Sequence, residues 1–320
     1  MSLPLILALL SGIFFGSWSV SLKKAGNYKF ENFFLMLAVA TLSSVLVITL
    51  ILEGAGIFGQ IIASDPKSIA WGLGGGACWG LATLSFGYAL GLVGLALGYT
   101  IILGLAMFLG TSVSMFFMAG IPAGVDSTVK IYVMLGVIVA LAGAFLSSYA
   151  GHVRSKTASS QGQRNFRKGI LICVLSSFLS SFFVWGYSGA HEQLSTWASI
   201  LLLVLGFSLA QLLVLGVKIT RKANWRAFKN LKSNVLCPLL GGLIFGLAVV
   251  LHFASADKVG VALAYPLMMG IQILGGNLWS FLVFGEWRGA PRNARTLQVF
   301  ALAVLMMASV LIGSAMGFVP

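Results

Sequence analysis

Two pairs of adjacent residues, Tyr99 with Thr100 and Tyr265 with Pro266, are suited to holding a small solute. The second pair follows the first by 166 positions. Proline removes a backbone N–H and leaves an upstream carbonyl free, and threonine can also perturb a helix. Helix breaks at corresponding positions of two repeats are typical of a central binding site. We therefore predict that these residues lie near one, although a packing kink beside two buried tyrosines would explain the pattern equally well.

Further polar side chains fall inside apolar stretches, where they are costly and usually face the interior of a helix assembly. Neutral amides, hydroxyls and aromatic rings can hydrogen-bond and stack on a polyhydroxylated solute, whereas a fixed charge would suit an ion. For Gln272, hydrogen bonding between helices is an equally good interpretation. The substrate-binding residues that we predict are Tyr99, Thr100, Thr111, Tyr265, Gln272 and Asn277.

His252 is the predicted coupling-ion residue, because histidine can exchange a proton near neutral pH. A structural, hydrogen-bonded histidine is the competing interpretation. No carboxylate lies in the centre of an apolar stretch. The acidic residues at span ends or in loops are Glu53, Asp65, Asp126, Glu192, Asp257 and Glu286.

The residue sets that enzymes use are missing from the sequence. It has no clustered metal ligands, no paired carboxylates in an apolar stretch, and no serine or cysteine beside a base. The glycine-rich run Gly72–Gly80 lies inside an apolar stretch and no lysine follows it as in a phosphate-binding loop. Cys78, Cys173 and Cys237 lie far apart, without zinc or redox spacing. We predict a protein that is not an enzyme and that uses no metal or cofactor.

Ten apolar stretches must position these residues. The chain is 59% hydrophobic and 8% charged, with a mean hydropathy of +1.00, which excludes a soluble globular domain. Each stretch is long enough to cross about 30 Å of hydrocarbon as a helix, and lipid offers the backbone no other hydrogen-bond partner. We predict an all-α polytopic membrane protein whose first stretch is a retained span rather than a signal peptide. The predicted spans are residues 3–22, 33–52, 69–90, 95–118, 131–150, 169–189, 197–216, 235–255, 260–284 and 296–317.

The basic residues fall on one side of these spans. Of 20 lysines and arginines, all but Lys67, Lys130 and Lys258 lie in one alternating set of loops. The positive-inside rule places that set in the cytoplasm and both termini outside it. Membrane topology thus accounts for the net charge of +13 without a nucleic-acid partner. We expect a multi-pass protein of the cell (inner or plasma) membrane, with the lipid bilayer as its surroundings.

Two halves of the sequence are related. An offset of 166 positions aligns glycines and tyrosines without a gap, including Gly94 with Gly260, Tyr99 with Tyr265, and Gly110 with Gly276. Each half has five spans, an odd number, so the second half enters the membrane with opposite polarity. We predict two inverted five-helix repeats, residues 1–150 and 169–320, joined by a cytoplasmic linker, residues 151–168.

Several motifs resemble the drug/metabolite transporter superfamily, and within it the L-rhamnose-proton symporter family and the related glucose/ribose porters. They are LKKAGNYKFEN from Leu22, the run from Cys78 to Thr111, LGVIVALAGAF from Leu135, and FGEWRGA from Phe284. The resemblance implies ten spans, sugar uptake driven by a cation gradient and, for the rhamnose porters, termini outside the cytoplasm. It assigns no individual site residue.

We therefore predict a secondary active transporter that moves a sugar, similar to L-rhamnose, or another small polar metabolite by alternating access, coupled to protons. An exporter of drugs, metabolites or amino acids from the same superfamily is the alternative, and the 23 phenylalanines and 8 tryptophans are compatible with it. A non-transporting scaffold or sensor would need a larger soluble region than the longest loop, of roughly 18 residues, provides.

Overall fold

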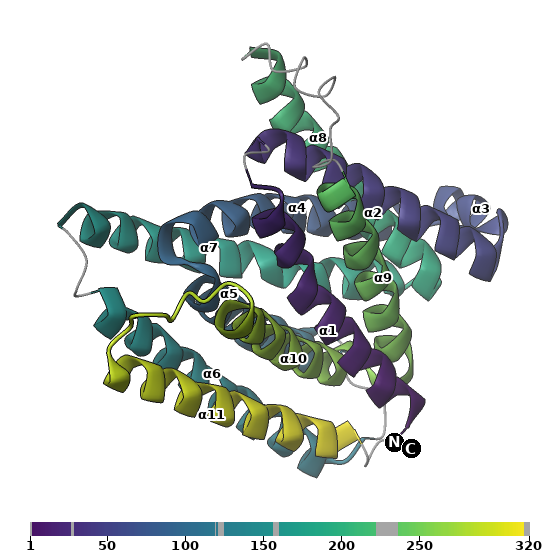
Figure 1. The fold of residues 1–320 in the computed structure, drawn as a ribbon. Helices are drawn as coiled ribbons and strands as arrows, with labels where there is room; N and C mark the ends of the chain where they lie inside the picture. Colours follow the sequence, from purple (N-terminus) through teal and green to yellow (C-terminus); the bar gives the residue numbers. More distant parts are fainter. Residues whose placement is uncertain are drawn as a thin grey trace.

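Helices make up the structure, a computed structural model that describes residues 2–26, 29–118, 120, 125–155, 160–221 and 236–316. Within these ranges there is no strand (Figure 1). The helices are α1 (Leu3–Lys24), α2 (Phe30–Glu53), α3 (Gly56–Ala63), α4 (Pro66–Val93), α5 (Leu95–Phe117), α6 (Ser127–Ser155), α7 (Ser160–His191), α8 (Thr196–Arg221), α9 (Leu236–Val259), α10 (Val261–Leu282) and α11 (Arg292–Met316).

Ten of these described helices, all except α3, are long and apolar enough to cross a membrane. They coincide with the ten predicted spans, so the polytopic all-α fold is confirmed. Large apolar side chains such as Ile51, Phe145, Leu171 and Leu282 are more than 70% exposed, as lipid-facing residues are. The short helix α3 was not predicted, because eight residues are too few to be recognised as a span.

The predicted linker is shorter than its composition indicated, because α6 and α7 extend into it from both sides. Of residues 151–168, residues 156–159 lie outside the part of the chain that the structure describes. The same is true of residues 222–235, which carry the basic loop residues Lys222, Arg226, Lys229 and Lys232.

Helix bounds follow the 166-residue offset closely. The starts of α2 and α8, the starts of α5 and α10, and the ends of α4 and α9 are each separated by it. A single glycine joins α4 to α5 and another joins α9 to α10, and their φ angles are 86° at Gly94 and 85° at Gly260. Only glycine adopts this conformation without strain, which explains why this aligned pair is glycine in both halves.

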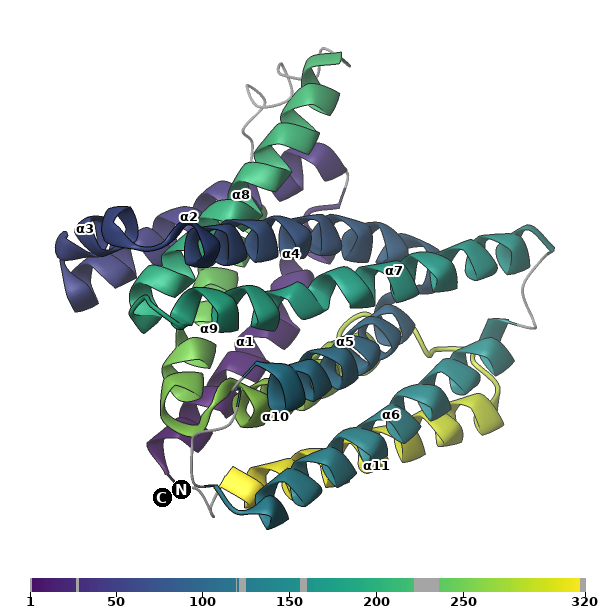
Figure 2. The ribbon, with the colours of Figure 1, turned by 180° about the vertical axis from the view of Figure 1, so that it is seen from behind.

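Helices from different halves pack against one another. In Figure 2, α4 lies beside α7 and α6 beside α11, and both pairs are in contact. The 166-residue offset relates these contacts to one another. It pairs α1 with α7, α4 with α9 and α5 with α10, and α7 packs on α4 and α5 just as α1 packs on α9 and α10. Glycines permit the close approach, since a Cβ on Gly75 would fall 2.9 Å from the carbonyl oxygen of Phe182. The centre of the molecule is therefore built from both halves.

Candidate functional site

A small cavity of about 40 Å³ lies at the centre, where helices of both halves meet. It has room for about three water molecules, so a larger solute requires side chains or helices to move. Six of the twelve residues that line it are aromatic. The residues that line it are Phe15 and Trp18 of α1, Trp79, Thr83 and Phe86 of α4, Leu103 of α5, Ser180 and Phe183 of α7, Phe245 of α9, and Met268, Met269 and Gln272 of α10.

Trp79 and Phe245 form the centre of the aromatic wall. They are counterparts under the 166-residue offset, and their rings stack with centroids 5.3 Å apart and planes inclined by 13°. Phe183 and Phe207 also contact Trp79, with ring centroids 4.6 and 4.4 Å away. Aromatic faces such as these can stack on the apolar face of a sugar ring or on another flat solute.

Polar groups in the cavity are few. Thr83 donates its hydroxyl proton to the carbonyl oxygen of Trp79 in its own helix, at 3.0 Å. None of the hydrogen bonds among the described residues involves the side chain of Gln272 or of Ser180, although both are more than 90% buried. A buried amide or hydroxyl without a protein partner retains its hydrogen-bonding capacity, so Gln272 and Ser180 are available to a solute. Of the predicted substrate-binding residues, Gln272 is the one that lines the cavity.

The predicted tyrosines flank the cavity without lining it. Tyr99 and Tyr265 are fully buried, and each ring packs on a glycine of the other half. A Cβ on Gly276 would lie 2.6 Å from the Tyr99 ring, and one on Gly110 would lie 2.5 Å from the Tyr265 ring. The matching of tyrosine and glycine in the two repeats is thus explained by reciprocal packing across the interface between the halves.

Thr100 and Asn277 lie in a polar cluster between α5, α6, α10 and α11. The Asn277 amide donates to the Thr100 hydroxyl at 3.3 Å and accepts from the Gln298 amide at 2.7 Å. The Ser147 hydroxyl lies 3.1 Å from that of Thr100 and 2.8 Å from the Gln298 carbonyl oxygen. Each of these residues has a protein partner, so the cluster satisfies itself. Ser147 and Gln298 were not predicted, although both are polar residues within predicted spans.

Thr111 and Pro266 remain apart from the cavity. Thr111 is fully buried, and its hydroxyl has no hydrogen-bond partner among the described residues. Helix α10 continues across Pro266, and α5 continues across Thr100. Pro266 lacks the N–H that would bond the Ala262 carbonyl, so the predicted break is the loss of one hydrogen bond rather than the end of a helix.

His252 is buried beside the cavity wall. Its ring stacks on Phe183 with centroids 5.4 Å apart, and Phe183 lines the cavity. The imidazole is 0% exposed, and neither ring nitrogen has a hydrogen-bond partner within the described structure. The hydroxyl of Tyr265, whose ring centroid is 6.0 Å away, is also buried and unpartnered. Such groups are rare in folded proteins and call for an explanation.

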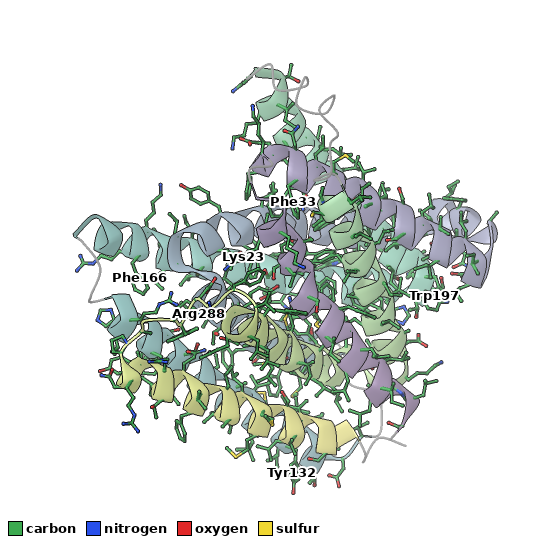
Figure 3. All side chains as sticks on the ribbon, in the orientation of Figure 1. Lys23, Phe33, Tyr132, Phe166, Trp197 and Arg288 are labelled. Atoms are coloured by element: carbon green, nitrogen blue, oxygen red, sulfur yellow. The ribbon has the colours of Figure 1, made fainter. Side chains whose placement is uncertain are left out.

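Charged groups meet at the end of the bundle that carries Lys23, which is labelled in Figure 3. Lys23 of α1 forms an ion pair with Glu286, which follows α10. Arg154 of α6 donates to the backbone oxygen of Glu286 at 3.2 Å, and Ser280 donates to its carboxylate at 3.0 Å. These contacts join the ends of α1, α6 and α10. We call them the charged cluster.

The opposite end of the bundle lies near the start of α1 and the end of α9. Two clefts of about 510 and 330 Å³ lie there, and His191 and Asp257 line both of them. Tyr187 lines the smaller cleft and stacks on Phe253, with ring centroids 4.0 Å apart. Phe253 in turn lies 4.8 Å from Phe183. These three rings separate the clefts from the central cavity, and none of them was predicted because their aromatic type does not distinguish them from lipid-facing residues.

Comparison with known proteins shows similarity to sugar transporters. Residues 228–317 match the family "Sugar transport protein". The L-rhamnose-proton symporter of Citrobacter koseri is 23% identical over 265 residues, which cover 75% of this chain and 76% of the symporter. The symporter of the same name from Mannheimia succiniciproducens is 22% identical over the same coverage. These findings confirm the predicted resemblance, and the relatives are named as transporters rather than enzymes.

One solved structure shares the fold over nearly the whole chain. A protein known by its crystal structure superposes with a TM-score of 0.60, covers 97% of each chain and is 15% identical in sequence. At this identity the likeness concerns the fold alone. The ten-helix arrangement is therefore one that an experimentally determined protein also adopts.

Proposed function

We propose that this protein is a secondary transporter of a sugar or a similar small polar solute. The observation that supports it most is the central cavity, which is lined by stacked aromatic rings and the unpartnered Gln272 amide and is formed by both halves. Aromatic rings and amides are the groups that bind a neutral polyhydroxylated solute. The similarity to L-rhamnose-proton symporters points to the same substrate class.

Transport proceeds by alternating access in this proposal. The two halves are inverted repeats, residues 1–150 and 169–320, and they rock around the cavity. Support comes from the exchanged helix contacts and from the matched glycine turns at Gly94 and Gly260. The two ends also have different contacts, since one carries the charged cluster and the other carries two clefts, and such a cycle opens the two ends in turn.

Protons drive the transport in our proposal, and His252 is the residue that we assign to the coupling ion. Its ring lies directly behind Phe183 of the cavity wall, so motion of one aromatic ring brings it into contact with the contents of the cavity. In this proposal the protein lies in the cell membrane with the charged cluster on the cytoplasmic side, and both termini lie outside the cytoplasm.

The experiment is uptake of labelled L-rhamnose and other monosaccharides into proteoliposomes, with and without an imposed pH gradient. We expect saturable uptake that rises when the outside is acidified. If uptake is the same with and without a pH gradient or a proton ionophore, transport is not coupled to protons. A lack of saturable flux for every sugar would refute the proposed substrate class.

An exporter of flat or amphiphilic compounds is the second candidate, and the six aromatic rings of the cavity favour it. A wall with so few polar groups binds an aromatic solute as readily as a sugar. Direction of flux separates the two functions. An exporter would protect cells from such a compound and would lower its concentration inside them.

A further inference from the structure

His252 and Tyr265 differ from their counterparts in the first half of the chain. Under the 166-residue offset, His252 corresponds to Phe86 and Tyr265 to Tyr99. Phe86 lines the cavity with an apolar ring, and the Tyr99 hydroxyl donates to the carbonyl oxygen of Phe15 at 3.4 Å. The first half therefore has no unpaired polar atom at these two positions, whereas the second half has three: both nitrogens of His252 and the hydroxyl of Tyr265.

Polar atoms without a hydrogen-bond partner are energetically unfavourable in the buried interior of a protein. Each lacks the hydrogen bonds that a protein group, a solute or water could supply. Two fully buried polar side chains on neighbouring helices, 6.0 Å apart, are left without partners in this state of the protein. A ligand that supplies the missing hydrogen bonds in another state would explain why the sequence keeps both.

Phe183 lies between these polar groups and the cavity. Its ring is 5.4 Å from that of His252 and 6.1 Å from that of Tyr265, and it also contributes to the cavity wall. The counterpart of Phe183 is Ser17, whose hydroxyl bonds the carbonyl of Ile13 in its own helix. No aromatic ring shields Phe86 from the cavity in that half. Rotation of a single side chain, Phe183, would enlarge the cavity on the side of the second half.

We propose that His252 and Tyr265 form a polar subsite of the solute-binding site, closed in this structure by the ring of Phe183. The proposal rests on the transport function proposed above and names the part of the site that selects the substrate. A neutral imidazole offers one donor and one acceptor, and a phenol can do both. Together they match two neighbouring hydroxyl groups of a monosaccharide, while Trp79 and Phe245 stack on its ring.

Stability provides a first test that requires no substrate. Replacing an unpaired buried polar group with an apolar one of similar shape removes its desolvation cost. We expect His252→Phe and Tyr265→Phe to raise the unfolding temperature of the purified protein by a few degrees. Tyr99→Phe is the matched control, because it removes a hydroxyl that has a partner, and it should lower that temperature. A lower unfolding temperature for both His252→Phe and Tyr265→Phe would mean that the two groups have structural partners, and it would overturn the proposal.

Transport kinetics provide the second test, with L-rhamnose and monosaccharides that each lack one hydroxyl group as the probes. We expect Tyr265→Phe to raise KM about fivefold, as the loss of one hydrogen bond does, and His252→Phe, which loses a donor and an acceptor, to raise it at least tenfold. For the wild type, at least one deoxy sugar should have a higher KM than the parent sugar. For the variant, that deoxy sugar and the parent sugar should have equal KM values. Unchanged KM and unchanged discrimination in both variants would overturn the subsite.

His252→Gln separates solute binding from proton coupling. Glutamine keeps a donor and an acceptor but does not take up a proton near neutral pH. We expect it to keep KM within threefold and to abolish accumulation driven by a pH gradient. A tenfold rise in KM for His252→Gln, equal to that of His252→Phe, would contradict hydrogen bonding to the solute. If no sugar is carried by the wild type, the proposed function fails, and the unfolding temperatures still decide whether the subsite groups are unpaired.

Discussion

At the scale of single residues, the polar side chains of the spans fall into two groups: those with a hydrogen-bond partner in the protein and those without one. Asn277 and Thr100 have partners in a closed cluster, so they stabilise the contact between helices. Gln272 and His252 have no side-chain hydrogen bond among the described residues, and both lie at or behind the cavity wall. An unpaired group in a site of low dielectric constant is costly, and the position of these two residues at the cavity distinguishes them from unpartnered side chains elsewhere, such as Asn32 and Thr111.

Gln272→Ala should weaken substrate binding while leaving the fold intact. One neutral hydrogen bond is worth about 1 kcal/mol, so KM for the transported sugar should rise about fivefold. Gln211→Ala is the control, because that buried amide donates to the Gly80 carbonyl at 3.3 Å and lies outside the cavity. Initial uptake rates over a range of sugar concentrations measure both. An equal change in KM for the two variants would exclude a direct contact by Gln272.

Gly276→Ala should destabilise the contact between the halves. The added methyl group would lie 2.6 Å from the Tyr99 ring, and such overpacking costs about 1–3 kcal/mol. Gly74→Ala is the control, since no atom lies within 4 Å of its added Cβ. Thermal unfolding of the purified protein is the measurement. The double variant Gly276→Ala with Tyr99→Ala should lose less stability than the two single changes added together, because the clash disappears.

At the scale of helices, the two ends of the bundle differ in how they are held. The charged cluster joins α1, α6 and α10 through Glu286, which accepts hydrogen bonds from Ser280 and Arg154 and pairs with Lys23. At the opposite end the two clefts are lined by His191 and Asp257, and contacts across helices occur there too: Thr196 donates to the Asp257 carboxylate and Ser255 donates to the Pro4 carbonyl at 2.7 Å. The two ends are thus held by different contacts, and alternating access requires the contacts at each end to break and re-form in turn.

Glu286→Gln should open the end that the charged cluster closes. The change removes the charge that attracts Lys23, so the ends of α1 and α10 separate more often. A cysteine placed at Thr83 of the cavity, in a protein without the three native cysteines, should react several times faster with a thiol reagent supplied from that end. Glu31→Gln is the control, because Glu31 pairs with Lys218 at 3.0 Å outside the cluster. Equal reaction rates in the two variants would contradict a gating role for Glu286.

At the scale of the whole molecule, charge and hydrophobicity define the orientation in the bilayer. The ten long helices expose large apolar side chains along their lengths, while basic residues such as Lys23, Arg154, Arg288 and Arg292 lie at or beyond helix ends. Three lysines fall in the other set of loops, which this topology places outside the cytoplasm: Lys67, Lys130 and Lys258. The positive-inside rule turns this distribution into a prediction of topology.

Accessibility labelling on intact cells tests that topology. A cysteine in place of Lys130 should react with a membrane-impermeant maleimide added outside, and one in place of Arg288 should react only after the cells are opened. Both positions are exposed in the structure, so burial does not limit the reaction. Labelling of the Arg288 position from outside would reverse the assignment, and labelling of both would contradict the inverted arrangement.

The sequence by itself determined the ten spans and the uneven distribution of charge and predicted the two repeats, and only the tertiary structure decided which side chains meet. Hydrophobicity and charge act on each helix separately through its contact with lipid and water, so they can be read along the chain. The meeting of side chains depends on the rotation and packing of helices distant in sequence. Phe183 and Phe178 of α7 show the difference: the first lines the cavity and the second is 49% exposed. For the same reason the sequence did not show that Thr100 and Asn277 form a hydrogen-bonded cluster with Ser147 and Gln298. It also did not show that His252 and Tyr265 lie next to each other behind the ring of Phe183.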